Sequence, residues 1–263
     1  MKGETRFRLD GRVAFISGAA GHLGREMALA LGEAGARLII NGRNAARLAA
    51  FASELEQNGI AAECAAFDMM DFETVRSFFG TRSRLDILIN NSVTMTPKAL
   101  AQVTPEDFDQ TYRSAVISAF EAVRAARPGL ISAVAAAGDA SVINIATMYA
   151  SVSPDPKLYN EPKQMSPPHY GAAKAGLVQL TRHLAAELGP SGVRVNALSP
   201  GPFPREEVIQ NDPPFAARLA ARTMLNRIGK APEIAGPVVF LASPASSFIT
   251  GTVLAADGGW TAW

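Results

Sequence analysis

Two tyrosine–lysine pairs in the middle of the chain have a spacing that suits proton transfer. Tyr159 precedes Lys163 by four positions, and Tyr170 precedes Lys174 by the same interval. Residues four apart on an α-helix lie on one face, so each lysine could approach the tyrosine of its pair. A nearby ammonium group stabilises a phenolate and lowers the tyrosine pKa from its ordinary value of about 10. Such a tyrosine could serve as a general acid and base.

The residues around each pair favour the second pair as the catalytic one. Pro162 stands between Tyr159 and Lys163, and a proline inside a helix removes a backbone donor and costs ~3 kcal/mol. Tyr170 and Lys174 instead open the run YGAAKAGLVQLTRHLAAEL, in which leucines recur at helical spacing. We therefore predict that Tyr170 and Lys174 are catalytic and that Tyr159 lines the same pocket.

A glycine-rich segment near the amino terminus follows one predicted strand, 12–18, and precedes one predicted helix, 22–34. Glycine permits a positive φ and lets the backbone approach a phosphate group. The helix that follows offers free N–H groups and the positive end of its dipole. In this context the spacing predicts a dinucleotide site, although an ordinary glycine-rich turn is the alternative. The predicted contacts are Gly18, Gly21, His22, Leu23 and Gly24.

The end of the second predicted strand bears on the choice of cofactor. An NAD site usually has an acidic residue at that position, whereas this chain has Asn41. Arg43 could pair with the 2′-phosphate of NADP through charge-assisted hydrogen bonds. NADP(H) is therefore the favoured cofactor and NAD(H) remains possible in principle, because Arg43 could also be a solvated surface residue. Asp68 could accept a hydrogen bond from adenine or could instead cap the next helix.

Composition excludes several classes of function. The 263 residues include 25 Lys and Arg against 24 Asp and Glu, a balance that gives no reason to expect nucleic acid or an anionic membrane as partner. No run approaches the ~18 apolar residues of a membrane span. Three histidines without paired acidic residues make a metal site improbable. A single cysteine, Cys64, rules out a disulfide within the chain, favours a cytoplasmic setting and is expected in a buried strand.

Apolar runs of strand length alternate with longer helical patterns along the whole chain. This alternation predicts an α/β fold with parallel strands joined by crossover helices. Strands are predicted over 12–18, 36–42, 60–68, 85–91, 140–146, 193–200 and 251–257, and helices over 22–34, 44–58, 71–80, 104–127, 170–188, 213–225 and 231–242.

Several motifs occur together in one order: SGAAGHLG, LINNS, YGAAK, SPGP and a terminal DGGW. From about Arg12 to Asp257 the chain thereby resembles the short-chain dehydrogenase/reductase family. The resemblance implies one Rossmann-type domain over 1–263, doubly wound, with a seven-stranded parallel sheet and helices on both faces. It also implies NAD(P)(H)-dependent interconversion of an alcohol and a carbonyl, and a homotetramer. INIATMY, SPDP and DGGWTAW are most similar to gluconate 5-dehydrogenase-like and other sugar dehydrogenase members.

The resemblance also implies roles for individual residues. Tyr170 would exchange a proton with the substrate oxygen, and Lys174 would lower the pKa of Tyr170 and hold the nicotinamide ribose. Thr147 stands where the family has a serine that binds the substrate oxygen, with Ser151 and Ser153 as less favoured hydroxyls. Further cofactor contacts are expected from Asp68, Met69, Asn90, Ser92, Pro200, Gly201 and Phe203.

Besides Thr147, the chain departs from the family pattern at three places. Ala115 stands where the family has an asparagine of its proton relay, with Ser114 and Ser118 nearby, and Val93 replaces a glycine beside the nicotinamide ribose. Between Thr147 and Tyr170 the chain is longer than the pattern, which predicts an insertion over 148–168. We expect this insertion and a substrate lid over 203–225 to shape the pocket, lined also by Tyr149, Tyr159 and His169.

Two hypotheses for function follow. The first is an oxidoreductase acting on a small hydroxylated substrate, a sugar or sugar acid being the suggestion of the sub-family resemblance. The second is a catalytically weakened protein of the same fold that binds dinucleotide and acts as a cofactor-responsive binding module. Ala115, Val93 and Thr147 favour the second hypothesis, and the intact Tyr170–Lys174 pair favours the first. Trp260 and Trp263, near the chain end, are expected to be buried at a subunit interface.

Overall fold

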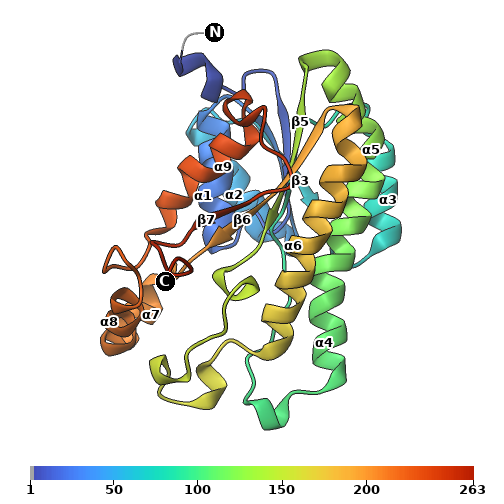
Figure 1. Ribbon diagram of the computed structural model, residues 1–263. Coiled ribbons are helices and arrows are strands. Elements are labelled where there is room, and N and C mark those ends of the chain that lie inside the picture. Colours follow the sequence, from blue (N-terminus) through green and yellow to red (C-terminus); the bar gives the residue numbers. More distant parts are fainter. Residues whose placement is uncertain (1–2) are drawn as a thin grey trace.

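Seven parallel strands form one sheet in the computed structural model, which describes residues 3–263 (Figure 1). The strand order is β3-β2-β1-β4-β5-β6-β7, so the direction of winding reverses between β1 and β4. In such sheets ligands bind outside the carboxyl ends of the strands at this reversal. The strands are β1 Val13–Ile16, β2 Arg37–Gly42, β3 Ala62–Ala66, β4 Ile87–Asn90, β5 Ala140–Ile145, β6 Val193–Pro200 and β7 Val253–Ala256.

Helices cover both faces of the sheet (Figure 1). Successive strand residues point to opposite faces, and on β1 the side chain of Phe15 packs with α3 and α5 while that of Ile16 packs with α1 and α9. The predicted doubly wound, seven-stranded fold is confirmed. The helices are α1 His22–Glu33, α2 Ala45–Gln57, α3 Phe72–Gly80, α4 Pro105–Tyr112, α5 Ser118–Ala137, α6 Pro168–Leu188, α7 Glu206–Asn211, α8 Pro213–Ala221 and α9 Ala235–Ala242.

Three helical predictions differ from the structure in detail, and the one over 231–242 begins as a 3-10 turn, Ala231–Ile234, before α9. The helix expected over 104–127 is α4, a π-helical turn over Arg113–Ile117 and then α5, which continues to Ala137. In the lid segment, α7 precedes α8, because the Asp212 side chain accepts from the Phe215 N–H and starts a new helix there. No helix within residues 3–263 is long and apolar enough to cross a membrane.

Two burial predictions are wrong. Cys64 is exposed, since β3 lies at the edge of the sheet and part of its surface is uncovered. Trp260 is buried within its own chain, where its ring meets Tyr149 edge-on at 6.3 Å between centroids. Trp263, by contrast, is 64% exposed.

The segment 148–168 contains short 3-10 turns in place of a continuous helix. Tyr159 ends one turn and Lys163 lies in the next, so this pair lacks the shared helical face that the Tyr170–Lys174 pair has on α6. Lys163 instead forms an exposed ion pair with Glu161 at 2.8 Å. The prediction that Pro162 keeps Tyr159 and Lys163 from lying on one helix thus agrees with the backbone observed.

A buried polar chain joins the central strands to α6. Asn90 and Asn144 are register partners on β4 and β5, and the Asn90 amide donates to the Asn144 side-chain oxygen at 2.8 Å. Asn144 in turn donates to the Thr181 hydroxyl at 2.9 Å. Asn90, predicted to contact the cofactor, therefore points into the sheet–helix interface and not into the ligand cavity.

Replacing Asn144 by alanine should lower the free energy of unfolding by roughly 2–4 kcal/mol, because the Asn90 amide and the Thr181 hydroxyl lose their buried partner. Asn58→Ala is the matched control, since its amide bonds only the exposed Glu54 carbonyl, and should change stability by no more than about 0.5 kcal/mol. Urea denaturation followed by circular dichroism measures both. Equal stabilities of the two variants would contradict the proposed buried chain.

Candidate active site

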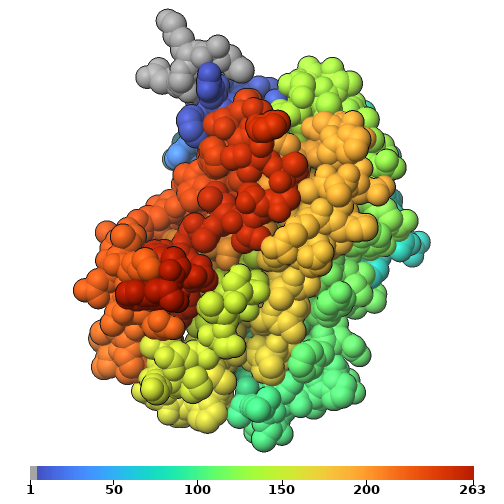
Figure 2. Space-filling view, in the orientation of Figure 1, coloured from blue at the N-terminus to red at the C-terminus, as the bar shows by residue number. Residues whose placement is uncertain are grey.

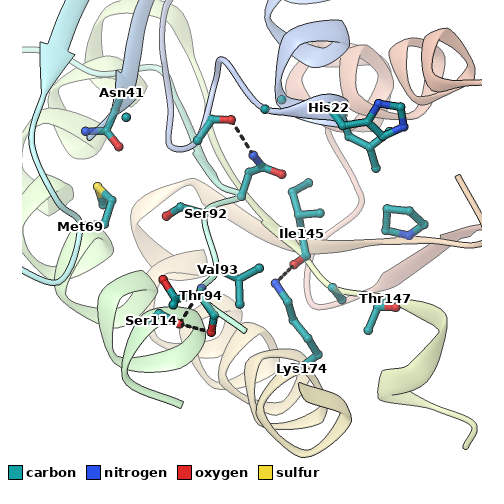
Figure 3. A pocket seen from close by; sticks show the side chains of 18 of the residues that line it. His22, Asn41, Met69, Ser92, Val93, Thr94, Ser114, Ile145, Thr147 and Lys174 are labelled. Carbon is teal, nitrogen blue, oxygen red and sulfur yellow. Dashed lines mark hydrogen bonds between the residues drawn. The ribbon is translucent and has the colours of Figure 1, made fainter. Parts of the chain in front are cut away.

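A cavity of about 560 Å³ opens at the carboxyl ends of the central strands (Figure 3). It runs from the glycine-rich loop after β1, past the ends of β4 and β5, to the first turns of α6. Most residues predicted from the sequence to bind cofactor or to catalyse line it. They are Gly18, Gly21, His22, Leu23, Gly24, Arg43, Asp68, Met69, Ser92, Thr147, Tyr170, Lys174, Pro200, Gly201 and Phe203.

The glycine loop leaves no space for larger residues. Gly18 has a φ of 64°, and a Cβ on Gly24 would lie 2.2 Å from the Gly18 carbonyl oxygen. Helix α1 begins directly after Gly21 without a side-chain cap, so its first N–H groups face the cavity uncapped. This uncapped helix end and the close backbone fit the pyrophosphate of a dinucleotide.

Polar contacts fix this loop against two neighbouring segments. The Asn91 amide donates to the carbonyls of Ser17 at 2.9 Å and Gly18 at 3.2 Å. On the opposite side, His22 Nε2 lies 3.1 Å from the Phe203 carbonyl. The loops after β1, β4 and β6 therefore hold one another in place around the cavity.

The far end of the cavity carries the groups relevant to cofactor choice. The Asn41 amide is buried and donates to the carbonyls of Ala65 and Phe67, so it braces the sheet edge. Arg43 is 68% exposed and lies 3.7 Å from the Asp68 carboxylate. The residue that caps α3 is Asp71. The alternative that Asp68 caps this helix is therefore wrong.

Lys174 lines the cavity with its ammonium group shielded from solvent. Its Nζ donates to the Ile145 carbonyl, the last of β5, at 2.6 Å (Figure 3). Only 2% of the residue is exposed. Burial lowers the pKa of Lys174 to about 8, because desolvation disfavours the charged form.

Tyr170 shares a hydrogen bond with Thr147, and the two side chains line the same cavity. Burial raises the pKa of Tyr170 above its ordinary value, and the hydrogen bond from Thr147 opposes this shift. The expected lowering by Lys174 is therefore not the dominant influence on Tyr170. Ser151 and Ser153 lie in a different cavity, which leaves Thr147 as the hydroxyl beside Tyr170.

Comparison with known proteins identifies the family. Residues 18–261 match the family model described as Enoyl-(Acyl carrier protein) reductase. Galactitol 2-dehydrogenase (L-tagatose-forming) of Cereibacter sphaeroides is 33% identical over 98% of both chains. The rhamnolipids biosynthesis 3-oxoacyl-[acyl-carrier-protein] reductase of Pseudomonas aeruginosa is 32% identical over 97% of this chain and 98% of its own.

A solved structure agrees with these relatives. Gluconate 5-dehydrogenase from Burkholderia cenocepacia, in complex with NADP and tartrate, superposes with a TM-score of 0.86 at 32% identity over 99% of each chain. The chain belongs to the short-chain dehydrogenase/reductase family. It is accordingly an oxidoreductase of that family, as the motifs indicated.

The structure shows where two departures from the pattern of the short-chain dehydrogenase/reductase family, Ala115 and Val93, lie relative to the cavity. Ala115 is buried in an apolar cluster with Val116 and Leu177, so it offers no polar side chain. Its neighbour Ser114 lines the cavity and accepts from the Thr94 N–H at 3.0 Å (Figure 3). Val93 is 37% exposed and also lines the cavity, where its side chain narrows the space that glycine would leave open.

The three residues predicted to contact substrate do not lie together in the structure. Tyr149 and Tyr159 line a second cavity next to the first. His169 points elsewhere, between α4 and α6, where its Nδ1 lies 2.9 Å from the Thr111 hydroxyl. Consecutive helix residues diverge by about 100° around the axis, so His169 and its neighbour Tyr170 cannot both face the cavity.

Other lining residues escaped prediction. Ser114 carried a signal, since it stood beside the position of the missing asparagine, and Asn91 lies within the LINNS motif. Ile145 contributes through its backbone, which no residue type reveals. The lining residues not predicted are Gly42, Phe67, Met70, Asn91, Thr94, Ser114, Ile145, Ala146 and Arg205.

Lys174 should make stability depend on alkaline pH. Burial lowers its pKa from 10.5 to about 8, so between these values the unfolded chain holds a proton that the folded chain releases. Stability contributed by this group therefore rises with pH through this window. Urea denaturation near neutrality and near pH 10 should show the wild type gaining stability relative to Lys174→Met.

The exposed Lys157→Met is the matched control and should follow the wild type at both pH values. If Lys174→Met and the wild type respond equally to pH, the lysine does not titrate in this window.

Proposed function

We propose that this protein is an NADP(H)-dependent oxidoreductase that interconverts an alcohol and a carbonyl in a small-molecule substrate. The observation that carries the proposal is the convergence of Tyr170, Lys174 and Thr147 with the glycine loop on one cavity. A glycine loop alone would support dinucleotide binding, and a tyrosine–lysine pair alone would support proton transfer. Both in one cavity support a redox reaction at a carbon that bears oxygen.

The three side chains have separate tasks in this proposal. Bound NADP(H) supplies or accepts the hydride. Tyr170 exchanges the proton with the substrate oxygen, and Thr147, hydrogen-bonded to it, positions that oxygen. Lys174 sits one helical turn from Tyr170 and stabilises negative charge that develops there, since it can carry a positive charge below about pH 8.

The preference for NADP(H) is supported at the adenosine end of the cavity. Arg43 is the exposed cation there, and the Asn41 side chain is engaged with backbone carbonyls. A guanidinium group recognises a phosphate through paired hydrogen bonds. The related gluconate 5-dehydrogenase was crystallised with NADP.

A catalytically weakened binding module is the less favoured alternative. Ala115 removes a polar group, and the neighbouring Ser114, which lines the cavity, has a hydroxyl that bonds the backbones of Thr94 and Thr111. A binding module would also have no need for a buried Lys174 held one turn from Tyr170. The cavity therefore supports the enzyme.

Assembly and location remain proposals. Phe108, Tyr112 and Phe120 are large apolar residues exposed on α4 and α5, and Phe248 is fully exposed before β7. Such surfaces favour the predicted homotetramer, because exposed apolar patches mark interfaces. The cytoplasmic location stays a prediction. So does the sugar or sugar acid substrate, together with the roles of 148–168 as an insertion and 203–225 as a lid.

Tyr170→Phe should lower turnover by about 10²–10⁴-fold while NADPH binding persists, because the variant lacks only the proton that general acid–base catalysis requires. Tyr112→Phe is the matched control, since it removes the hydroxyl of an exposed tyrosine on α4 that lines neither cavity. Absorbance of NADPH reports turnover, and fluorescence titration reports binding. Full turnover by Tyr170→Phe would refute the assignment.

Arg43→Ala should weaken NADPH binding by roughly 10- to 100-fold, the worth of a hydrogen-bonded charge pair, and leave NADH binding nearly unchanged. Arg37→Ala removes an exposed arginine at the opposite end of the same strand and should affect neither cofactor. Equal losses for NADPH and NADH on Arg43→Ala would show that Arg43 does not read the 2′-phosphate.

A further inference from the structure

We propose that the substrate of this oxidoreductase has an apolar body, a hydrocarbon chain or ring system that bears the reacting ketone or alcohol. This inference rests on the proposed redox function and adds the class of substrate. It departs from the sugar or sugar acid suggested by the sub-family resemblance. The observation behind it is the second cavity, of about 280 Å³, which shares Phe203 with the cavity that holds the candidate catalytic residues.

The second cavity is placed to receive the body of a substrate whose oxygen reaches Tyr170. Phe203 lines both cavities, and Met148 and Tyr149 of the second directly follow Thr147 of the first. Tyr149 is close enough to Tyr170 for the charge of one to raise the pKa of the other. A substrate could therefore lie in the second cavity with its oxygen between Tyr170 and Thr147.

The walls of this cavity come from distant parts of the sequence. Figure 2 shows the segment 148–168, the helices α7 and α8 and the carboxyl-terminal turn side by side on one face. Leu219 of α8 and Trp260 pack with Met148 in one apolar cluster. The Tyr159 and Phe215 rings lie 5.5 Å apart across the boundary between 148–168 and α8.

Apolar groups dominate the lining, and no side chain in it is charged. Besides proline rings, the walls consist mainly of thioether, aromatic and aliphatic side chains. These side chains belong to Met95, Met148, Tyr149, Tyr159, Met165, Phe203, Phe215 and Leu219.

The tyrosine hydroxyls and the Gln164 side-chain oxygen in these walls already have partners, which leaves the Gln164 amide nitrogen and the Ser166 hydroxyl as the other polar side-chain groups of the lining. The Tyr149 and Tyr159 hydroxyls bond each other at 2.7 Å, and the Ser166 backbone also bonds the Tyr159 hydroxyl. Gln164 accepts the Glu161 N–H through its side-chain oxygen at 2.9 Å. A polyhydroxylated substrate would find few free donors and acceptors here.

Two arginines close to this cavity in the chain, Arg218 and Arg205, are not arranged to bind a carboxylate in it. Arg218 on α8 donates to the Leu158 carbonyl at 2.7 Å and to the Asn160 side chain at 2.9 Å, so its guanidinium ties the wall together. Arg205 is exposed and lines the first cavity, not the second.

These contacts decide between the two substrate classes. A hydroxyl or carboxylate moved from water into this cavity would lose hydrogen bonds that the walls do not replace. A methylene group moved into it gains about 0.8 kcal/mol, which is about fourfold in affinity. Reduction would convert a ketone to an alcohol, with hydride from NADPH, which is oxidised, and a proton from Tyr170.

The test compares two sets of carbonyl compounds as substrates of the full-length protein with NADPH. One set is a homologous series of 2-ketones of increasing chain length, together with aryl ketones. The other contains ketoses and keto sugar acids. We expect kcat/KM to rise about fourfold per methylene along the first series until the cavity is filled, and to exceed the values of the second set.

Variants then locate the effect. Phe215→Ala should lower kcat/KM for the longest ketones by roughly tenfold, as expected from loss of a buried aromatic contact, and leave the shortest nearly unchanged. Phe7→Ala is the matched control, since Phe7 lies in the amino-terminal 3-10 turn and lines neither cavity. A uniform loss for all chain lengths on Phe215→Ala would count against the cavity as the binding site.

The outcomes separate this inference from the proposed function. Preferential reduction of ketoses or keto sugar acids overturns the apolar substrate and keeps the oxidoreductase. If NADPH binds but no carbonyl compound is reduced, the proposed function fails. The apolar substrate is then tested by the binding of ketones and sugar acids alone. Trp263→Phe leaves Trp260 as the one tryptophan, so its fluorescence reports occupancy of the adjacent cavity. A change in Trp260 fluorescence on addition of long ketones supports the inference. No change with long ketones, or an equal change with sugar acids, overturns it.

Discussion

A buried ammonium group bonded to the end of a central strand sets the geometry of the whole site. Lys174 donates to the last carbonyl of β5, at Ile145. Burial of a charge is costly unless it is hydrogen-bonded, so this contact holds α6 at one height against the sheet. Tyr170 stands one turn before Lys174, and Thr147 comes just after Ile145. The bond therefore brings a helix residue and a loop residue to the same point of the cavity.

Further hydrogen bonds hold the same strand, helix and loops in place. Asn144, next to Ile145 on β5, bonds Thr181 on α6, and a second buried contact thus ties the same strand to the same helix. In front, Asn91 and His22 join the loops that border the glycine turn. The sheet end is thereby tied together by polar contacts, and the second cavity beside it is built mostly from apolar side chains of the segment 148–168, α8 and the loop after β6.

The sequence was sufficient for what depends on local pattern. The alternation of strands and helices, the glycine turn and the helix that carries Tyr170 and Lys174 all follow from residue types and spacing, and Pro162 explains why Tyr159 and Lys163 share no helix. Prediction failed where a side chain's direction depends on distant packing. Asn90 turns to its neighbour Asn144, His169 to Thr111 and Trp260 into its own chain. Backbone contributors such as Ile145 have no signature in residue type at all.

The shared walls of the second cavity affect how specificity could change among relatives. Segment 148–168, α8 and the turn at Trp260 pack against one another in one cluster, and Arg218 bonds two of them together. A loop grafted from another enzyme would lack the side chains of α8 and of the turn at Trp260 that it packs against in its own protein. Substrate range in this scaffold is thus not modular, and its engineering calls for libraries that vary the three segments together.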